Sequence, residues 1–169
     1  MSSILELGKA IHIRRTDMGL TQTALAKLSG LSRATVNQLE NGSAVDLSLT
    51  RASRLLSCLG LSVVISQPRA KQPSAAAGKD SALCIAARTA SVSYTRSVDA
   101  DELRQAITTT VLPAALQPHM ATLLDEAPLS VLAAAVEQVH AEQDIARAQI
   151  WKNLREMATA LKSDRAIWA

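Results

Sequence analysis

The chain has almost no aromatic side chains: two Trp, one Tyr and no Phe, or 2% of 169 residues. Its core therefore has to be built from Leu, Val, Ile and Ala, a composition that favours packed helices over sheets. Hydrophobic residues make up 48% of the chain, which is enough for one domain of this length or for two small ones. We expect a mainly α-helical globular protein.

Long apolar runs are missing as well. The sequence has no stretch of about 18 apolar residues, which a transmembrane helix needs. Its N-terminus also lacks the basic start and continuous apolar stretch of a secretion signal. We expect a cytoplasmic chain that makes no membrane contact.

Residues that bind metals or form disulfides are few and scattered. Cys58 and Cys84 stand alone, without CxxC spacing, so we expect two free thiols. His12, His119 and His140 lie far apart and near no cysteine or carboxylate pair with ligand spacing. We expect neither a metal site nor a cofactor. The sequence also lacks the Gly-rich phosphate loop that many nucleotide-dependent enzymes contain.

Positive charge is concentrated in the first part of the chain. Residues 1–71 hold nine Lys and Arg against four Asp and Glu, a net charge of +5. Residues 72–169 hold nine against eleven, a net charge of −2. The first excess agrees in sign with a phosphate-binding surface, although ordinary domains also reach it.

A segment of low complexity divides the chain. Residues 67–81 contain two Pro, one Gly, small and charged residues and no large apolar side chain, which is typical of a linker. We therefore expect an N-terminal unit over residues 1–66, a linker over 67–81 and a C-terminal unit over 82–169.

Caps and apolar spacing predict short helices in the N-terminal unit. A first helix ends at Gly19, Thr21 caps a second and Ser32 caps a third. Because only residues 29–31 connect the second and third helices, these two must cross steeply, as in a helix-turn-helix. A further helix over residues 46–59 closes the core.

Two short β-branched segments predict strands, residues 61–66 and residues 90–95. A lone edge strand needs a partner. We expect residues 61–66 to pair with their copy in a dimer, or with the second segment.

The C-terminal unit has the pattern of a small bundle of three or four helices. Asp99 caps an acidic first turn, residues 129–139 are apolar on most sides, and residues 150–161 have one apolar face. Such a bundle can dimerise, hold an effector or dock a partner protein, and the sequence leaves these open. Trp168 lies in a short tail, as either a binding hot spot or part of a disordered end.

Residues 20–42, LTQTALAKLSGLSRATVNQLENG, carry a more specific pattern. It begins at Thr21 and Gln22, ends at residues 38–42, and has Leu25, Ala26, Gly30, Ser32 and Val36 between them. The pattern resembles the phage-repressor-like (Xre, Cro/repressor type) helix-turn-helix family over roughly residues 2–60. The resemblance implies a five-helix, lambda-repressor-like domain that binds double-stranded DNA. It also implies a homodimer on a palindromic operator, because two recognition helices must reach major grooves about 34 Å apart.

The third helix would enter the major groove with its N-terminal residues at base edges. Arg33 can give two donors to a guanine, Asn37 or Gln38 can pair with adenine, and Ala34 can touch a thymine methyl. Groups at the start of the second helix and beyond the end of the third would hold phosphates. The candidate DNA-binding residues are Thr21, Gln22, Arg33, Ala34, Asn37, Gln38, Asn41 and Ser43.

Other polar residues in this segment have structural roles. The family typically pairs an arginine late in the first helix with the glutamate of the closing motif, so Arg15 is expected to bind Glu40. Ser32 is expected to cap the third helix, and Asn37 is either a base contact or a solvated helix residue.

The segment LSVVIS after the last helix of this unit resembles antitoxin repressors of the HipB type, in which strands of two subunits form a small dimer sheet. That resemblance implies a repressor that is the antitoxin and autoregulator of a toxin-antitoxin pair, with the toxin as protein partner. The alternative is a phage-type or metabolic regulator whose C-terminal unit dimerises or senses a ligand.

Self-cleavage is the one enzymatic alternative, since relatives of phage repressors cut themselves at an Ala-Gly bond and Ala77-Gly78 lies in the linker. The reaction needs a Ser nucleophile and a Lys base in a β-rich domain, whereas this C-terminal unit is patterned for helices. We therefore expect no catalytic activity.

Overall fold

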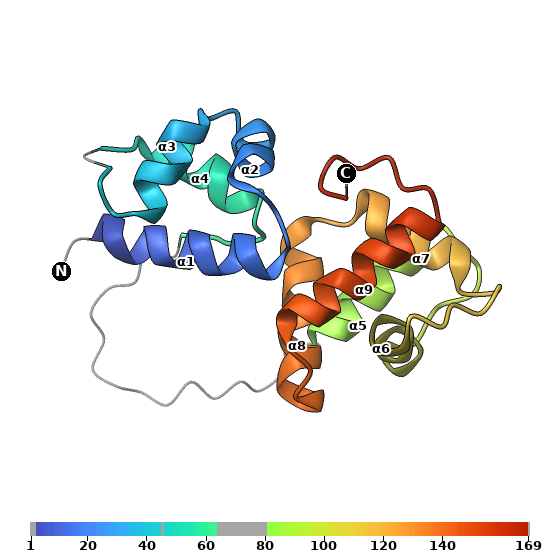
Figure 1. Cartoon of the computed structure of the whole chain (residues 1–169). Coiled ribbons are helices and arrows are strands. Elements are labelled where there is room, and N and C mark those ends of the chain that lie inside the picture. Colours follow the sequence, from blue (N-terminus) through green and yellow to red (C-terminus); the bar gives the residue numbers. More distant parts are fainter. Residues whose placement is uncertain (1–2, 45, 64–80, 169) are drawn as a thin grey trace.

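The computed structural model describes residues 3–44, 46–63 and 81–168, and their regular secondary structure is all helical. No helix among them is both long and apolar enough to cross a membrane. The mainly α class is confirmed for this part of the chain (Figure 1). The helices are α1 (Ser3–Asp17), α2 (Gln22–Ser29), α3 (Arg33–Glu40), α4 (Leu49–Ser57), α5 (Ala82–Ser91), α6 (Ala100–Thr109), α7 (Gln117–Glu126), α8 (Leu129–Gln143) and α9 (Arg147–Ala160).

Side-chain caps set the starts of α2 and α3. Thr21 Oγ1 accepts a hydrogen bond from the Ala24 N–H at 3.0 Å. Ser32 Oγ accepts one from the Thr35 N–H, also at 3.0 Å. Helix α2 ends at Gly30, whose φ of +70° is a left-handed conformation that glycine adopts at little cost. Both predicted caps are confirmed, and α3 follows α2 after a short turn.

The first 63 residues contain four helices in their described part, so the implied count of five is wrong. The helix predicted over residues 46–59 is also shorter, because α4 begins at Leu49 and ends at Ser57. Leu47 packs against the core from a non-helical segment. The core is thus closed partly by irregular chain, where sequence patterning had suggested one longer helix.

The strand predicted over residues 61–66 is wrong for the three residues that the structure describes. Leu61 N donates to Leu56 O at 2.9 Å, a bond that wraps the chain around Gly60 and closes the end of α4. Residues 61–63 therefore complete a helix terminus and form no ladder. Residues 64–66 lie outside the described residues.

The strand predicted over residues 90–95 is wrong as well. Ala90 and Ser91 are the last residues of α5, and residues 92–95 form the irregular turn behind it. Ala90 is fully buried, and α5 packs against α6, α7 and α8. Burial of this Ala-rich helix face overrides the β preference of Val92 and its neighbours, which is only a context-dependent tendency.

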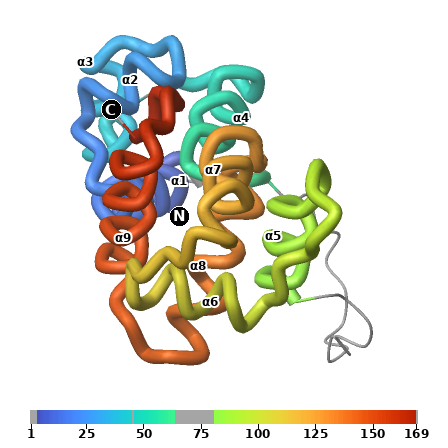
Figure 2. The backbone as a smooth tube through the Cα atoms, turned by 90° about the vertical axis from the view of Figure 1, so that its right-hand side faces the viewer, coloured from blue at the N-terminus to red at the C-terminus, as the bar shows by residue number. Residues whose placement is uncertain are grey.

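Helices α5 to α9 form the C-terminal bundle, whereas three or four helices were expected (Figure 2). The predicted Asp99 cap is confirmed, with Glu102 completing a capping box at the start of α6. The predicted linker, residues 67–81, lies outside the described residues except for Ser81, which caps α5.

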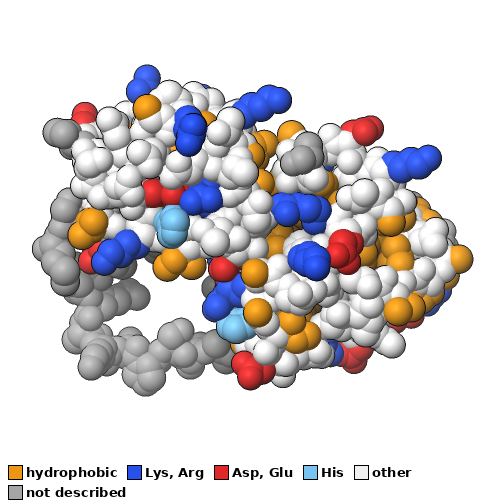
Figure 3. Space-filling model, viewed as in Figure 1, with side chains coloured by type: hydrophobic (Ala, Val, Ile, Leu, Met, Phe, Trp, Pro, Cys, Tyr) orange, Lys and Arg blue, Asp and Glu red, His pale blue; other side chains and the backbone are white. Residues whose placement is uncertain are grey.

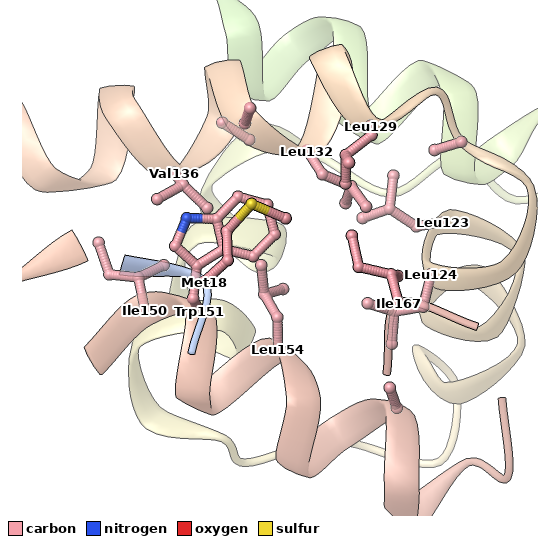
Figure 4. Packing of buried hydrophobic residues seen from close by; sticks show 14 of the residues in the cluster. Met18, Leu123, Leu124, Leu129, Leu132, Val136, Ile150, Trp151, Leu154 and Ile167 are labelled. Atoms are coloured by element: carbon pink, nitrogen blue, oxygen red, sulfur yellow. The ribbon is translucent and has the colours of Figure 1, made fainter. Parts of the chain in front are cut away.

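One continuous hydrophobic core joins α1 to α4 with the bundle. Met18, at the end of α1, lies among Trp151, Ile150 and Val136 from α9 and α8 (Figure 4). Polar contacts reinforce the junction, because an Arg155 guanidinium nitrogen donates to the Met18 carbonyl. We call helices α1 to α4 the helix-turn-helix half. This half therefore packs on the bundle through the end of α1.

The C-terminal tail belongs to this core. Trp168 is 8% exposed, its Nε1 donates to Leu124 O at 3.2 Å, and its ring lies 6.4 Å from that of Trp151. Both expectations for Trp168, an exposed binding hot spot and part of a disordered end, are therefore wrong. Sequence patterning missed this contact because the two tryptophans are brought together only by the folded bundle.

Gly60, just beyond the end of α4, packs closely on α8. A Cβ at Gly60 would lie 2.7 Å from Ala133 Cβ and 2.8 Å from Leu129 O. A Cβ at Gly30 would meet only the Arg54 guanidinium, at 3.6 Å. Since both glycines have left-handed φ angles, each alanine substitution costs about 1 to 2 kcal/mol of backbone strain, and only Gly60→Ala adds a clash.

We expect Gly60→Ala to lower the free energy of unfolding by about 1 to 3 kcal/mol more than Gly30→Ala does, measured by urea denaturation of the whole chain. Equal losses for the two variants would contradict close packing of Gly60 on α8.

Candidate nucleic-acid interface

Helices α1, α2 and α3 fix the orientation of the candidate surface (Figure 1). Gly8 of α1 lies so close to the Leu39 carbonyl that no Cβ would fit between α1 and α3. Leu25 of α2 and Val36 and Leu39 of α3 are fully buried. One face of α3 is therefore held against α1 and α2, which turns its opposite face outward.

The outward face of α3 carries the four residues predicted to read bases. Arg33, Ala34, Asn37 and Gln38 are all exposed. Gln22, in the first turn of α2, borders them. A shallow hollow of about 300 Å³ is lined by Gln22, Arg33, Ala34 and Asn37. The structure brings these four together, and Gln38 lies on the same helix outside the hollow.

An ion-pair network centred on Glu40 lies behind this face. Arg15 binds both carboxylate oxygens, with Nε at 2.6 Å from Oε1 and Nη2 at 2.8 Å from Oε2. Its Nη1 donates to Leu20 O at 2.7 Å. The Glu40 side chain is only 2% exposed. The predicted pairing of Arg15 with Glu40 is confirmed, and it ties the end of α3 to α1 and to the α1–α2 turn.

Gln22 connects the network to the exposed face. Its Nε2 donates to Glu40 Oε2 at 3.1 Å and to Asn37 Oδ1 at 3.4 Å. Asn41 Nδ2 also donates to Asn37 Oδ1, at 3.0 Å. Asn37 is thus exposed but not simply solvated, because its amide oxygen accepts hydrogen bonds from Gln22 and Asn41.

His12 is a member of this network that the sequence prediction missed. Its Nδ1 lies 2.9 Å from Glu40 Oε2 and 3.2 Å from Arg15 Nη2. From the sequence, His12 was considered as a metal ligand, and this contact was not predicted. The spacing of three residues between His12 and Arg15 on one helix was the available signal, since such residues lie on the same face.

The predicted phosphate-binding side chains already have partners within the chain. Thr21 Oγ1 is occupied by its helix cap, and Ser43 Oγ donates to Gln38 O at 3.3 Å. Asn41 donates to Asn37, as above. The start of α2 still offers backbone N–H groups, because a helix N-terminus leaves its first N–H groups without helical partners.

Hydrogen bonds keep Glu40 ionised. Burial by itself would raise the pKa of Glu40, but hydrogen bonds from Arg15, His12 and Gln22, together with the charge of Arg15, outweigh it. They lower the pKa of Glu40 from 4.5 to about 2. The carboxylate is therefore charged at neutral pH, when it can accept all these bonds.

Lys and Arg side chains are scattered over the helix-turn-helix half on the face shown in Figure 3, with no continuous basic patch. Arg33 has no acidic partner among the described residues. A ligand at α3 would therefore meet a few separate cations and the polar side chains between them.

Comparison with known families supports this site. Residues 11–65 match the family model described as Helix-turn-helix. The match supports a helix-turn-helix regulator family for this segment. The match includes every candidate DNA-binding residue and supports a DNA-binding transcription regulator, whereas α5 to α9 lie outside it. No curated protein and no solved structure matches the chain.

Histidine and cysteine side chains form no cluster of metal ligands in the described part of the chain. No group of three or more His, Cys, Asp or Glu residues there could hold a metal ion. Cys58 and Cys84 are free and half-buried. His119 is buried with Nδ1 at 3.2 Å from Ala90 O, and His140 Nδ1 lies 2.8 Å from Ile145 O. Each histidine thus has a partner in the fold.

The lowered pKa of Glu40 predicts how stability depends on pH. Because the folded pKa lies below the ordinary value of 4.5, ionised Glu40 stabilises the fold above pH 4.5, and this contribution is lost as the pH falls towards 2. We expect Glu40→Gln to lower the free energy of unfolding by about 3 kcal/mol at pH 7, measured by urea denaturation.

The difference between Glu40→Gln and the unmodified chain should shrink as the pH is lowered from 4.5 towards 2. Glu156→Gln is the matched control, because Glu156 lies 3.9 Å from Lys152 and both side chains are more than half exposed, so little change is expected. A Glu40→Gln loss that is the same at every pH would contradict an ionised network.

Proposed function

We propose that the chain is a cytoplasmic, sequence-specific DNA-binding repressor that reads a palindromic operator as a homodimer and has no catalytic activity. One observation carries the proposal. The exposed face of α3 presents Arg33, Ala34 and Asn37 beside Gln22 of α2, within a segment that matches the helix-turn-helix family.

The side chains on this face suit base edges in the major groove. Arg33 is exposed and has no acidic partner among the described residues, so its guanidinium is free to give two donors to guanine O6 and N7. Gln38, also exposed, pairs with adenine in the same way, and Ala34 contacts a thymine methyl. These residues would carry the choice of sequence.

Phosphate contacts would hold the domain in register. Backbone N–H groups at the start of α2, next to Thr21 and Gln22, suit a phosphate because the helix dipole also favours an anion there. Asn41 follows α3 and would bind a neighbouring phosphate through its second Nδ2 hydrogen, and Ser43 would bind one by exchanging its bond to Gln38 O. Such contacts carry little sequence information.

A homodimer would let two copies of the motif bind one operator. Two α3 helices reach successive major grooves only when two copies are held about 34 Å apart along the DNA. The helix-turn-helix half is seated on the bundle through α1 and Gly60, and the residues that line the hollow on α3 are exposed or half-exposed in this docked arrangement. The bundle therefore leaves the α3 face open to DNA.

Arg33 and Asn41 separate base selection from general affinity. We expect Arg33→Ala to relax the preference at one operator position by about 1 to 3 kcal/mol, because one bidentate base contact is lost. Gln38→Ala should relax a different position. Asn41→Ala should weaken all sequences alike, since a phosphate contact is independent of the base. Selection from a random DNA library, followed by titrations at two salt concentrations, measures both effects.

Arg96→Ala is the control, because Arg96 is an exposed cation of the bundle paired with Glu102, away from α3. It should leave operator selection unchanged. An Arg33→Ala variant with unaltered selection would show that the register assigned to α3 is wrong, and affinity that does not fall with salt would argue against DNA as the ligand.

An antitoxin role is the finer form of this proposal. It depended on a strand over residues 61–66, and the described part of that segment is no strand. Its remaining support is the resemblance of the LSVVIS sequence itself to antitoxin repressors of the HipB type, and residues 64–66 of that segment lie outside the described residues. The alternative, a phage-type or metabolic regulator that senses a ligand or only dimerises, places the effector or the dimer contact in the C-terminal unit.

Co-expression with the tagged product of the neighbouring gene tests the antitoxin role. We expect a stable complex in size-exclusion chromatography and rescue of growth from the toxin. Arg33→Ala should keep both properties while changing operator selection, because toxin binding would not use α3. No complex and no rescue would exclude the antitoxin role and leave the DNA-binding proposal intact.

A further inference from the structure

A cavity of about 410 Å³ lies between the helix-turn-helix half and the bundle. Leu28 of α2 and residues of α4 line one side, and Leu129 and residues 165–167 line the other. Both backbone views place the C-terminal segment beside the helix-turn-helix half (Figures 1 and 2). A molecule in this cavity would touch both halves at once.

The walls combine apolar surface with positive charge. Leu28, Leu129 and Ile167 supply the apolar part. Arg54 and Arg165 are the charged residues of the lining, which contains no Asp or Glu. The lining thus carries two cations and no carboxylate, and Asp125 outside the lining is close enough to Arg165 to act on it.

The two guanidinium groups differ in how firmly they are held. Arg165 Nη1 donates to Ala127 O at 2.7 Å and to Leu124 O at 3.2 Å, which fixes the group and leaves its other N–H donors available. Burial lowers the pKa of Arg165, although the charge of Asp125 acts in the opposite direction. Arg54 is exposed and has no hydrogen-bond or ion-pair partner among the described residues. One fixed and one adjustable guanidinium suit a planar anion.

We propose that this cavity binds a small organic acid, with its carboxylate between Arg54 and Arg165 and its apolar body against Leu28, Leu129 and Ile167. The volume lies in the range of about 300 to 1,000 Å³ that is common for small-molecule sites. Paired arginines recognise a carboxylate with bidentate geometry, and the apolar residues of the lining offer surface to the rest of the molecule. The bound acid would tie the two halves together, so it would also raise the stability of the chain.

This inference goes beyond DNA binding and does not rest on it. Octanoate and phenylpropionate serve as aliphatic and aromatic probes, and octylammonium and phenylpropylammonium serve as partners of the same shape and opposite charge. Isothermal titration calorimetry of the whole chain should show one site for at least one of the acids. Its affinity should exceed that of the matching amine by about tenfold or more, because two guanidiniums attract the acid and repel the amine.

Arg54→Met should lower the affinity for the acid about tenfold and remove most of the rise in Tm that the acid causes. Arg51→Met is the matched control, because Arg51 is an exposed residue of the same helix and does not line the cavity. It should leave both measurements unchanged. Either of two results would overturn the proposal: acids that bind no better than the amines, or equal affinities for the Arg54→Met and Arg51→Met variants.

Discussion

The buried pairing of Arg15 with Glu40 is the constraint on which the rest of the helix-turn-helix depends. Glu40 is almost fully shielded from water, and a charge in such a position is tolerated only with close partners. Arg15 supplies two hydrogen bonds to it and a third to the Leu20 carbonyl. The pair therefore fixes the end of α3, the body of α1 and the turn that leads into α2, and so sets the position of the exposed face.

Helix α1 also joins this constraint to the bundle. Its Arg15 faces Glu40, whereas its Arg14 binds Glu137 of α8 at 2.9 Å, and Met18 at its end enters the shared core. A movement of the bundle against α1 would act on the helix that positions α3. The cavity lined by Arg54 and Arg165 lies at the same junction, where an occupant contacts both sides. Coupling between the halves thus has a physical route through packed elements, even though only the first half matches a known family.

Features that depend on neighbouring residues could be predicted from the sequence. The caps Thr21, Ser32 and Asp99 follow from local hydrogen bonding, and the Arg15–Glu40 pair followed from a family pattern. Features set by distant residues could not. Ala90 carries a local strand signal but is buried in α5 by helices from later in the sequence, and Trp168 meets Trp151 only after the bundle has formed. The packing of Met18 on α9 brings together residues more than a hundred positions apart. A single sequence holds no signal for such a contact.

Hydrogen bonds within the chain divide the candidate site into two groups. Gln22 donates to Glu40 and Asn37, so its amide nitrogen is already used by a carboxylate that stays ionised at neutral pH. The hydroxyl proton of Ser43 is likewise used, in its bond to Gln38 O, whereas Thr21 Oγ1 only accepts its cap bond and its O–H can still donate to a phosphate. Releasing the Gln22 amide or the Ser43 hydroxyl to meet DNA would leave partners unsatisfied. The side chains of Arg33 and Gln38 are exposed and have no hydrogen-bond partner within the described part of the chain. Within the proposed function, Arg33 and Gln38 are therefore better placed to select the operator sequence. Gln22 is better placed to hold α2 and α3 in a fixed relative position.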